Sequence, residues 1–279
     1  MQKKVLAIND ISCVGRCSLT VALPIISASG AECSILPTSI LSNHTAFPQY
    51  TFLDLTNEMK NICEKWRSLN LKYDYLYTGF LGSIEQVDLV GEIVQVFKGN
   101  GQVLVDPAMA DNGSMYKIFD LAFALKMREL CMKADIICPN ITEACFLTGI
   151  PYQEGPYSDD FIDSLIFKLG QLGIKSLVLT GVSYDGIHLG AVSYDYQSKD
   201  KNYYSREMID DYFHGTGDCF ASALVAALVK GNDLAKATKI AVDFTVDSII
   251  ATIKYDNIDK NYGVCFEEVL SKLVGELNG

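Results

Sequence analysis

Two strand–helix units follow one another in QVLVDPAMADNGSMYKIFDLAFALKMRELCMKADIICPNITEACFLTG, residues 102–149. The apolar runs predict strands at 102–107 and 134–139, and the segments behind them predict helices at 118–132 and 141–148. Both strands are apolar on both faces, which is typical of central strands in a parallel sheet that helices cover on each side. The stretch therefore predicts an α/β fold.

The same alternation continues on both sides of this stretch. Further strands are predicted at 4–8, 32–37, 73–78 and 176–181, and further helices at 18–29, 55–69, 83–98, 158–172, 217–230, 233–252 and 264–277. Between 182 and 205 a Tyr-Asp-Gly turn separates two alternating segments, which predicts a small β-hairpin excursion. No linker rich in Pro, Gly or Ser interrupts the sequence, so we expect residues 1–279 to form one domain with right-handed crossovers.

The composition is that of an ordinary globular protein. The chain has 279 residues, 49% of them apolar and 20% charged, which argues against a disordered or fibrous protein. The formal net charge is −11. An acidic chain without a basic tract attracts neither nucleic-acid phosphates nor anionic lipid, so we expect no nucleic-acid or membrane partner. No apolar run approaches the roughly 18 residues that a membrane span needs.

Nine cysteines are scattered along the sequence without a CxxC pair. Their number is odd, and several lie in apolar runs, as Cys138 and Cys145 do. This is typical of buried reduced thiols and not of a disulfide framework or a zinc site. The apolar run after the charged start ends at Asn9, which is too short for a signal peptide. We therefore expect a cytoplasmic protein.

Polar residues gather where the predicted strands end. In a parallel sheet these ends share one edge, where ligands bind. The residues there are Asn9, Asp10, Thr38, Asp106, Asp111, Asn140, Glu143, Thr180 and Gly181. The acids Asp106, Asp111 and Glu143 would repel one another unless a cation lay among them, and Mg²⁺ with the phosphates of a nucleotide meets that need. The alternative is that these residues cap the helices that follow.

The sharpest local feature is HGTGDCFASALVAALV at 214–229. Gly215 and Gly217 flank a turn that opens an apolar helix, and backbone N–H groups at such a turn form an anion site. Asp218 then lies at its mouth. In phosphoryl transfer the turn would stabilise the transferring group while Asp218 takes the proton of the attacking hydroxyl. The alternative is a first-turn acid that the helix dipole favours. Neither GxxxxGK[ST] nor GxGxxG occurs.

Four motifs occur in a family-specific order: LSNHT at 41–45, VDPAMADNGSMY at 105–116, ADIICPNITEACFLTG at 134–149 and HGTGD at 214–218. Through them the chain resembles the ribokinase-like superfamily and, within it, the pyridoxal (vitamin B6) kinases, over nearly its whole length. The resemblance implies a three-layer α/β/α fold with a central, mainly parallel sheet. It also implies phosphorylation of the 5′-hydroxymethyl group of pyridoxal, pyridoxine or pyridoxamine by ATP.

The resemblance assigns roles to individual residues. Asp218 would be the catalytic base, and Gly215, Thr216 and Gly217 the anion hole. Asn140, Glu143, Thr180 and Gly181 would bind ATP, and Asp106, Asp111 and Glu143 would organise Mg²⁺ through water. Asp10 or Ser12, Thr45 and Phe80 would contact the vitamer, and Tyr116 would belong to a flap over it. Relatives often need a monovalent cation, which makes K⁺ a candidate, and they point to a homodimer.

Two departures from the family pattern concern vitamer choice. Asp10 stands where pyridoxal kinases usually have Ser, although a shift of two residues would bring Ser12 there, and Phe80 replaces a ring-stacking Tyr. The kinase step should survive both changes. A carboxylate at Asp10 would favour a cationic partner, such as the aminomethyl group of pyridoxamine or a protonated ring.

Three other functions are compatible with parts of the pattern. Hydroxymethylpyrimidine kinase of thiamine synthesis is a close relative, but that group commonly has GTGC where this chain has GTGD. A sugar or nucleoside kinase fits the LSNHT motif less well. A non-catalytic vitamer-binding protein would keep the fold without consuming ATP, and the intact set of polar motifs argues against such decay.

Overall fold

The computed structural model describes residues 1–256 and 259–279. In this part of the chain a nine-stranded sheet runs in the order β11-β10-β9-β8-β5-β4-β1-β2-β3. The parallel strands are β1 (Lys4–Ser12), β2 (Glu32–Leu41), β4 (Tyr75–Thr78), β5 (Gln102–Val105), β8 (Ile136–Ile137) and β9 (Ser176–Val182). The antiparallel strands are β3 (Phe52–Asp54) at one edge and β10 (His188–Asp195) and β11 (Lys201–Glu207) at the other.

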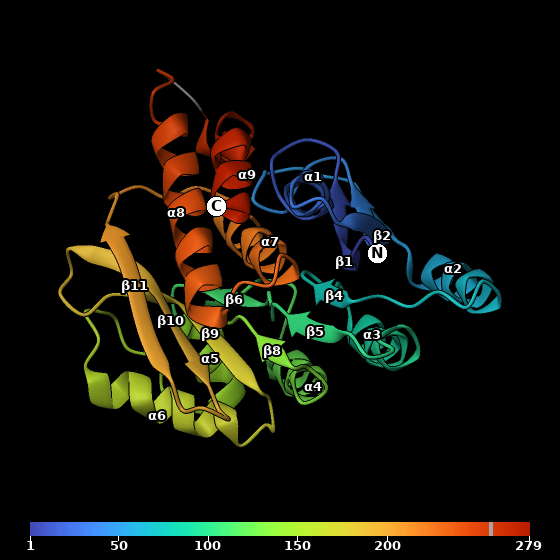
Figure 1. The fold of residues 1–279 in the computed structure, drawn as a ribbon, viewed down its shortest axis with the longest axis horizontal. Coiled ribbons are helices and arrows are strands. Elements are labelled where there is room, and N and C mark those ends of the chain that lie inside the picture. The colour runs from blue at the N-terminus through green and yellow to red at the C-terminus, as the bar shows by residue number, and fades with distance from the viewer. Residues whose placement is uncertain (257–258) are drawn as a thin grey trace.

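Helices cover both faces of this sheet and give three layers (Figure 1). One buried core includes side chains from α2 (Thr56–Ser68), α3 (Ile84–Phe97), α4 (Leu121–Cys131), α5 (Ile141–Thr148) and α6 (Asp159–Gly170). The other includes side chains from α1 (Leu19–Ala28), α7 (Thr216–Val229), α8 (Leu234–Thr252) and α9 (Leu270–Asn278). The expected α/β fold with a mainly parallel sheet is confirmed.

Some predicted boundaries differ from the observed ones for local reasons. The segment 182–205 is antiparallel as expected, but its strands extend the central sheet, and the Tyr-Asp-Gly turn joins β9 to β10. The helix expected from 118 begins at Leu121, because Asp120 accepts the N–H of Phe123 at 3.0 Å and caps it. The helix expected from 264 begins at Leu270, after a 3₁₀ turn at Phe266–Val269.

A small second sheet was not predicted. It pairs β6 (Ala110–Asp111) with β7 (Ser114–Met115). Two-residue strands have no periodicity to detect, and the Asn112-Gly113 pair between them indicates only a turn. This short hairpin holds Asp111 and leads to Tyr116, so it forms the segment that the sequence suggested as a flap.

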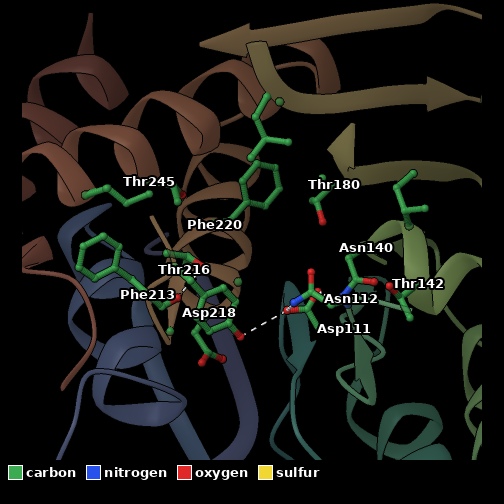
Figure 2. Close-up of a pocket in the computed structure, with 18 of the residues that line it drawn as sticks. Asp111, Asn112, Asn140, Thr142, Thr180, Phe213, Thr216, Asp218, Phe220 and Thr245 are labelled. Carbon is green, nitrogen blue, oxygen red and sulfur yellow. Dashed lines mark hydrogen bonds between the residues drawn. The ribbon is translucent and has the colours of Figure 1, made fainter. Parts of the chain in front are cut away.

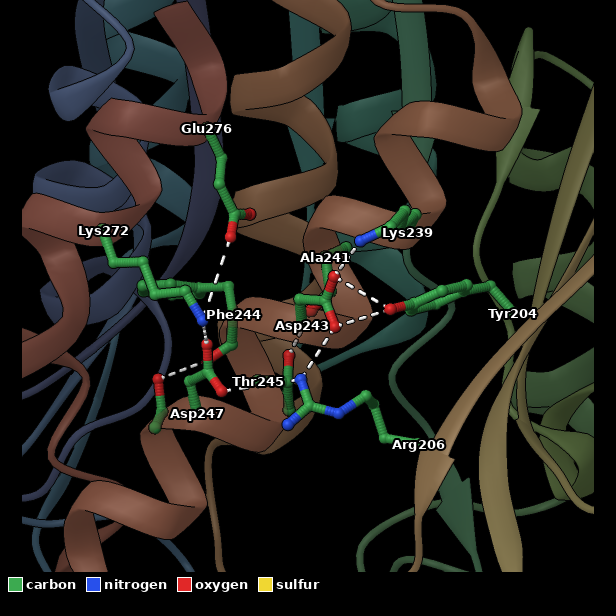
Figure 3. A network of polar contacts seen from close by, with 11 residues as sticks. Tyr204, Arg206, Lys239, Ala241, Asp243, Phe244, Thr245, Asp247, Lys272 and Glu276 are labelled. Atoms are coloured by element: carbon green, nitrogen blue, oxygen red, sulfur yellow. Dashed lines mark hydrogen bonds and ion pairs between the residues drawn. The ribbon is translucent and has the colours of Figure 1, made fainter. Parts of the chain in front are cut away.

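A polar network joins α8 to β11 behind the site (Figure 3). Asp243 on α8 is buried and accepts hydrogen bonds from Tyr204 at 2.8 and 3.0 Å and from Arg206 at 2.8 Å. Lys239 also pairs with it. Burial alone would raise the pKa of Asp243, but the hydrogen bonds from these partners outweigh burial and lower it. The network therefore fixes α8 against the edge of the sheet.

Two further observations concern the described residues as a whole. None of their helices combines the length and the apolarity that crossing a membrane requires. All nine cysteines are free thiols, and seven of them are buried.

Candidate active site

A pocket of about 510 Å³ lies at the carboxyl edge of the parallel strands, beside the start of α7 (Figure 2). It gathers most of the predicted site residues: Asp106, Asp111, Tyr116, Asn140, Glu143, Thr180, Gly181, Gly215, Thr216, Gly217 and Asp218. Four predicted vitamer contacts, Asp10, Ser12, Thr45 and Phe80, are absent from its lining. The side expected to hold the nucleotide is therefore assembled as a pocket, whereas the side expected to hold the vitamer is not.

The turn before α7 leaves backbone N–H groups free at the start of the helix. Gly215 occupies the N-cap position with φ of +76° and provides no side-chain cap. A Cβ atom at Gly215 would lie 1.9 Å from the carbonyl oxygen of Arg16, so only glycine fits between the two segments. A Cβ at Gly217 would have nothing within 4 Å. Unsatisfied N–H groups at an open helix start form an anion site.

Asp218 lies in the first turn of α7, next to these N–H groups. Asn9 Nδ2 donates a hydrogen bond to its Oδ1 over 3.3 Å, and the backbone N–H of Ser18 also faces it. Burial nevertheless raises the pKa of Asp218. A carboxylate whose pKa moves toward neutral pH is suited to accept a proton during a reaction.

Asn9 connects this base to the opposite side of the site. Its Oδ1 accepts the backbone N–H of Asp10 at 2.9 Å and that of Phe80 at 2.8 Å. The sequence placed Asn9 at the end of a strand without assigning it a role. A Cβ at Gly79 would lie 2.2 Å from Asn9 Nδ2, so the glycine before Phe80 makes room for this side chain.

Glu143 and Asn140 form a capping box at the start of α5. Asn140 Oδ1 accepts the N–H of Glu143, and Glu143 Oε2 accepts the N–H of Asn140, both at 2.9 Å. Glu143 Oε1 also accepts the N–H of Met109 at 3.1 Å. The capping alternative is therefore confirmed for these two residues. Both also line the pocket, so capping fixes the position of a carboxylate that faces it.

Asp106 does not cap a helix. Burial, followed by the charges of Glu143 and Asp218, raises its pKa well above the usual range. Burial likewise raises the pKa of Glu143. Among the described residues that line the pocket there is no lysine or arginine. This set of carboxylates is suited to a cationic ligand, such as the divalent ion that accompanies a nucleotide.

Asp111 lies apart from this pair, on the β6–β7 hairpin. Its Oδ2 accepts a hydrogen bond from Tyr212 over 3.3 Å, and its Oδ1 accepts the N–H of Asn112 at 2.9 Å. The hairpin is also held by the N–H of Gly113, which donates to Thr142 Oγ1 at 3.0 Å. Over residues 1–256 and 259–279, no three His, Cys, Asp or Glu side chains are close enough to ligate one metal ion directly. Coordination through water stays a prediction.

Asp10 is buried behind the pocket and is engaged within the protein. It accepts hydrogen bonds from Ser12 over 3.1 Å and from Ser18. Burial and, to a smaller extent, the charge of Asp218 raise the pKa of Asp10 to about 6. Ser12 is fully buried and bonded to Asp10. Asp10 and Ser12, the two candidates for one vitamer contact, are therefore hydrogen-bonded to each other.

Two other predicted vitamer contacts, Thr45 and Phe80, lie outside the pocket lining, whereas Tyr116 belongs to it. Thr45 is exposed on the loop after β2, next to His44, whose ring packs 4.8 Å from that of His214. Phe80 is half-buried, and its ring lies 5.7 Å from that of Phe119. Tyr116, at the end of the flap, keeps 42% of its surface exposed.

Sequence reasoning missed the apolar wall of the pocket. Leu189 from β10, Phe220 from α7, and Val242, Val246 and Ile249 from α8 line it together with Thr245. These residues belong to ordinary apolar patterns, so nothing in the sequence distinguishes a pocket wall from core. Thr142 and Tyr212, which hold the flap, were also missed, because a single hydroxyl in a loop or a helix has no local signature.

The family model for phosphomethylpyrimidine kinase matches residues 50–263. The chain belongs to this family. The curated relatives of the chain have two kinds of name, pyridoxal kinase and hydroxymethylpyrimidine/phosphomethylpyrimidine kinase. The assignment agrees with the expected ribokinase-like fold and with a site built for phosphoryl transfer.

Several curated relatives of the chain are named pyridoxal kinase. The human enzyme is 30% identical, with 85% of this chain and 78% of the relative covered. The Dictyostelium discoideum enzyme is 28% identical, with 90% and 87% covered. A hydroxymethylpyrimidine/phosphomethylpyrimidine kinase from Haemophilus influenzae is 30% identical, with 66% and 67% covered.

Solved structures show the same fold over nearly the whole chain. A Bacteroides thetaiotaomicron protein, provisionally described as a phosphomethylpyrimidine kinase and crystallised with pyridoxal, is 34% identical, with 98% of this chain and 96% of that chain covered at a TM-score of 0.93. Pyridoxal kinase from Lactobacillus plantarum is 27% identical, with 99% and 98% covered at a TM-score of 0.89.

Proposed function

We propose that this protein is a pyridoxal kinase, which transfers the γ-phosphoryl group of ATP to the 5′-hydroxymethyl group of B6 vitamers. The observation that carries the proposal is the pairing of Asp218 with the open N–H groups of the α7 turn in one pocket. A base and an anion site side by side are what transfer to an alcohol requires. Relatives named pyridoxal kinase, and the Bacteroides structure that contains pyridoxal, support the vitamer as acceptor.

The roles of the residues follow from their positions. Asp218 accepts the proton of the attacking substrate hydroxyl. The hydroxyl oxygen bonds to the γ-phosphorus of ATP while the bond from that phosphorus to ADP breaks and ADP leaves. The N–H groups around Gly215, Thr216 and Gly217 stabilise the charge on the transferring phosphoryl group. Asn140, Thr180 and Gly181 contact the rest of the nucleotide, and the apolar wall from α7, α8 and β10 holds its base.

Magnesium enters as part of the nucleotide substrate. The carboxylates of Asp106 and Glu143 face the pocket without a lysine or arginine in its described lining, and they would hold the ion through water, with Asp111 at the rim. A divalent ion supplies positive charge that offsets the phosphates. Potassium stays a candidate that only an assay with and without it tests.

Hydroxymethylpyrimidine kinase is the second candidate. The family model and the Haemophilus relative favour it. Asp218 argues against it, because that group commonly has cysteine at the corresponding position. A non-catalytic vitamer-binding protein is the third candidate and predicts binding without ADP formation.

A coupled ADP-release assay separates the three. The purified protein is given ATP, Mg²⁺ and K⁺ with pyridoxal, pyridoxine, pyridoxamine or hydroxymethylpyrimidine, each in a separate reaction. Turnover on the vitamers is expected. Turnover on hydroxymethylpyrimidine alone would move the protein to thiamine synthesis, and vitamer binding without ADP would make it a binding protein.

We also propose that residues 1–279 act as one domain, that the chain is a cytoplasmic protein and that it forms a homodimer. The continuous central sheet supports the first, and the free buried thiols support the second. For the third, the edge strand β3 leaves Phe52 and Leu53 exposed by 43% and 58%. Light scattering on the purified protein tests the dimer, and a Leu53→Asp variant tests this edge.

A further inference from the structure

Two buried hydroxyl groups lie below the site and have no part in the scheme above. Tyr77 on β4 and Ser222 on α7 are each 0% exposed. Neither hydroxyl has a hydrogen-bond partner among the described residues. Burying a hydroxyl without a partner lowers stability, so each such group in a native fold needs an explanation.

Both residues have Asp218 as a neighbour. Ser222 is four residues after Asp218, so the two side chains lie one above the other on the same face of α7. Ser222 is close enough to the Tyr77 hydroxyl to influence its pKa, although the two do not meet hydrogen-bond geometry. Burial, followed by the charges of Asp218 and Asp106, raises the pKa of Tyr77 well above its usual value. The phenol therefore stays protonated and can donate a hydrogen bond.

Asp218 has few donors for a carboxylate that must be ionised to work. Its donors are Asn9 at 3.3 Å and the N–H of Ser18. Several titratable groups from the surrounding elements also interact with it: Asp10, Asp106, Cys17, Cys219, His44 and Tyr77. Two of these are acids whose charges oppose its ionisation. Additional hydroxyl donors from below would offset that repulsion.

We propose that Tyr77 and Ser222 are positioning residues that donate hydrogen bonds, through one buried water, to the ionised carboxylate of Asp218. Neither hydroxyl gives up its proton in the reaction, because Asp218 alone accepts the proton of the substrate hydroxyl. The pair keeps this carboxylate ionised and oriented between turnovers. The inference rests on the proposed function, since it requires Asp218 to be the base.

The test compares Tyr77→Phe with Tyr75→Phe. Tyr75 is two residues earlier on β4, so it faces the same side of the sheet. Its hydroxyl donates to the carbonyl of Leu228 at 3.3 Å, and the carboxylates whose charges act on it are Asp74 and Asp135, not those of the site. We expect Tyr77→Phe to lower kcat about tenfold, the size of one hydrogen bond to a charged group, with KM for ATP and for the vitamer unchanged. Tyr75→Phe should leave kcat unchanged. Ser222→Ala is a second, smaller change to the same site.

Each variant is also made in an Asp218→Asn background, which retains the shape of the side chain and removes its charge. If the hydroxyls act through the ionised carboxylate, Tyr77→Phe and Ser222→Ala have no further effect on the residual rate there. The same loss of kcat in both backgrounds would overturn the inference and leave a packing role. So would wild-type kcat for Tyr77→Phe and Ser222→Ala alike. A wild-type protein without phosphoryl transfer to any acceptor would instead refute the proposed function.

Discussion

Two groups of carboxylates in this protein are treated in opposite ways. Asp243 is buried between α8 and β11, where Tyr204, Arg206 and Lys239 contact it and lower its pKa despite burial. Asp106 is enclosed as well, yet its neighbours Glu143 and Asp218 are themselves acids, and its pKa is raised well above the usual range. The same residue type is neutralised by the fold in one place and left for a ligand to neutralise in the other.

The contrast teaches how structural and functional charges differ. A carboxylate that holds two elements together needs partners from the chain itself, because an unpaired buried charge is costly. A carboxylate cannot bind a cationic ligand if a lysine or arginine of the chain already pairs with it. Asp106 and Glu143, which have no cation, line the pocket, whereas Asp243, which has two, joins scaffold elements.

The largest expected effect is on catalysis. Asp218→Ala should lower turnover by about 10²-fold or more, the scale of a positioned base, with little change in affinity for ATP. Steady-state kinetics with pyridoxal measure turnover, and nucleotide-binding titrations measure the affinity for ATP. Asp120→Ala is the control, because it removes the N-cap carboxylate of α4, which does not line the pocket. Near-normal turnover of Asp218→Ala would remove Asp218 from the mechanism.

Gly215→Ala should disrupt the anion turn. The added Cβ meets the Arg16 carbonyl oxygen at 1.9 Å while φ stays at +76°. We expect a stability loss above about 2 kcal/mol and loss of ATP binding, measured by thermal unfolding and by titration. Gly231→Ala shares the positive φ, at +88°, but its Cβ has nothing within 4 Å. It should lose only about 1 kcal/mol. Equal losses of stability in the two variants would mean that the positive φ alone, and not the contact with Arg16, causes the loss.

Asp106→Asn and Asp243→Asn should separate the two groups of carboxylates. Asp106→Asn removes repulsion, so Tm should stay equal or rise while turnover falls. Asp243→Asn leaves Arg206 and Lys239 without their carboxylate, so the free energy of unfolding should fall by about 2 kcal/mol with turnover per folded molecule retained. Calorimetry and steady-state rates on both variants check this. A Tm loss for Asp106→Asn as large as that for Asp243→Asn would erase the distinction.

Asp10 should have a smaller effect on stability, and this effect depends on pH. Its pKa in the folded protein is raised to about 6 from 3.8. Protonated Asp10 therefore makes its full contribution to the stability of the fold below its pKa of 3.8 in the unfolded chain. This contribution is lost as the pH rises through about 6. Between about pH 5 and 7 the wild type should lose about 1 kcal/mol relative to Asp10→Asn. Urea unfolding of both proteins at both pH values measures this loss. If the free energies of unfolding of wild type and Asp10→Asn changed with pH in parallel, Asp10 would be ionised over the whole range.

The smallest effect concerns vitamer choice. If the Asp10 carboxylate attracts a cationic substrate, Asp10→Asn should lower the ratio of pyridoxamine to pyridoxine turnover several-fold. Initial rates with each vitamer give the ratio. Ser12→Ala is the control, because it removes a donor to Asp10 while leaving the carboxylate. An unchanged ratio in Asp10→Asn would end the cation hypothesis.

The sequence was informative where chemistry depends on local patterns. The six parallel strands, the turn before α7 and the residues that follow strand ends were all predictable, because periodicity and glycine spacing are local. The placing of Asp106 and Glu143 at one edge of the sheet followed from the rule that parallel strands end at one edge, whereas Asp218 was found through the glycine turn that precedes its helix.

Other parts depended on contacts between distant segments. The bond between Asp10 and Ser18, the packing of Phe80 on Phe119, and the tie between Tyr212 and Asp111 join residues with no shared pattern. The apolar wall from α8 is likewise indistinguishable from core until the fold leaves it facing a cavity. These features decide the shape of the vitamer side, which is why that side was predicted least well.

The Arg16 carbonyl has one more consequence. It is enclosed by Gly215 on one side and by Gly263 on the other, where a Cβ would lie 2.7 Å from it, and the Arg16 N–H donates to the carbonyl of Tyr262 at 3.0 Å. An early segment of the polypeptide is thus locked between two late ones. During synthesis the ribosome releases residue 16 long before residue 263, so the turn at Gly215 reaches its final shape only after residue 263 has been made. The turn is therefore completed well after its own residues have left the ribosome.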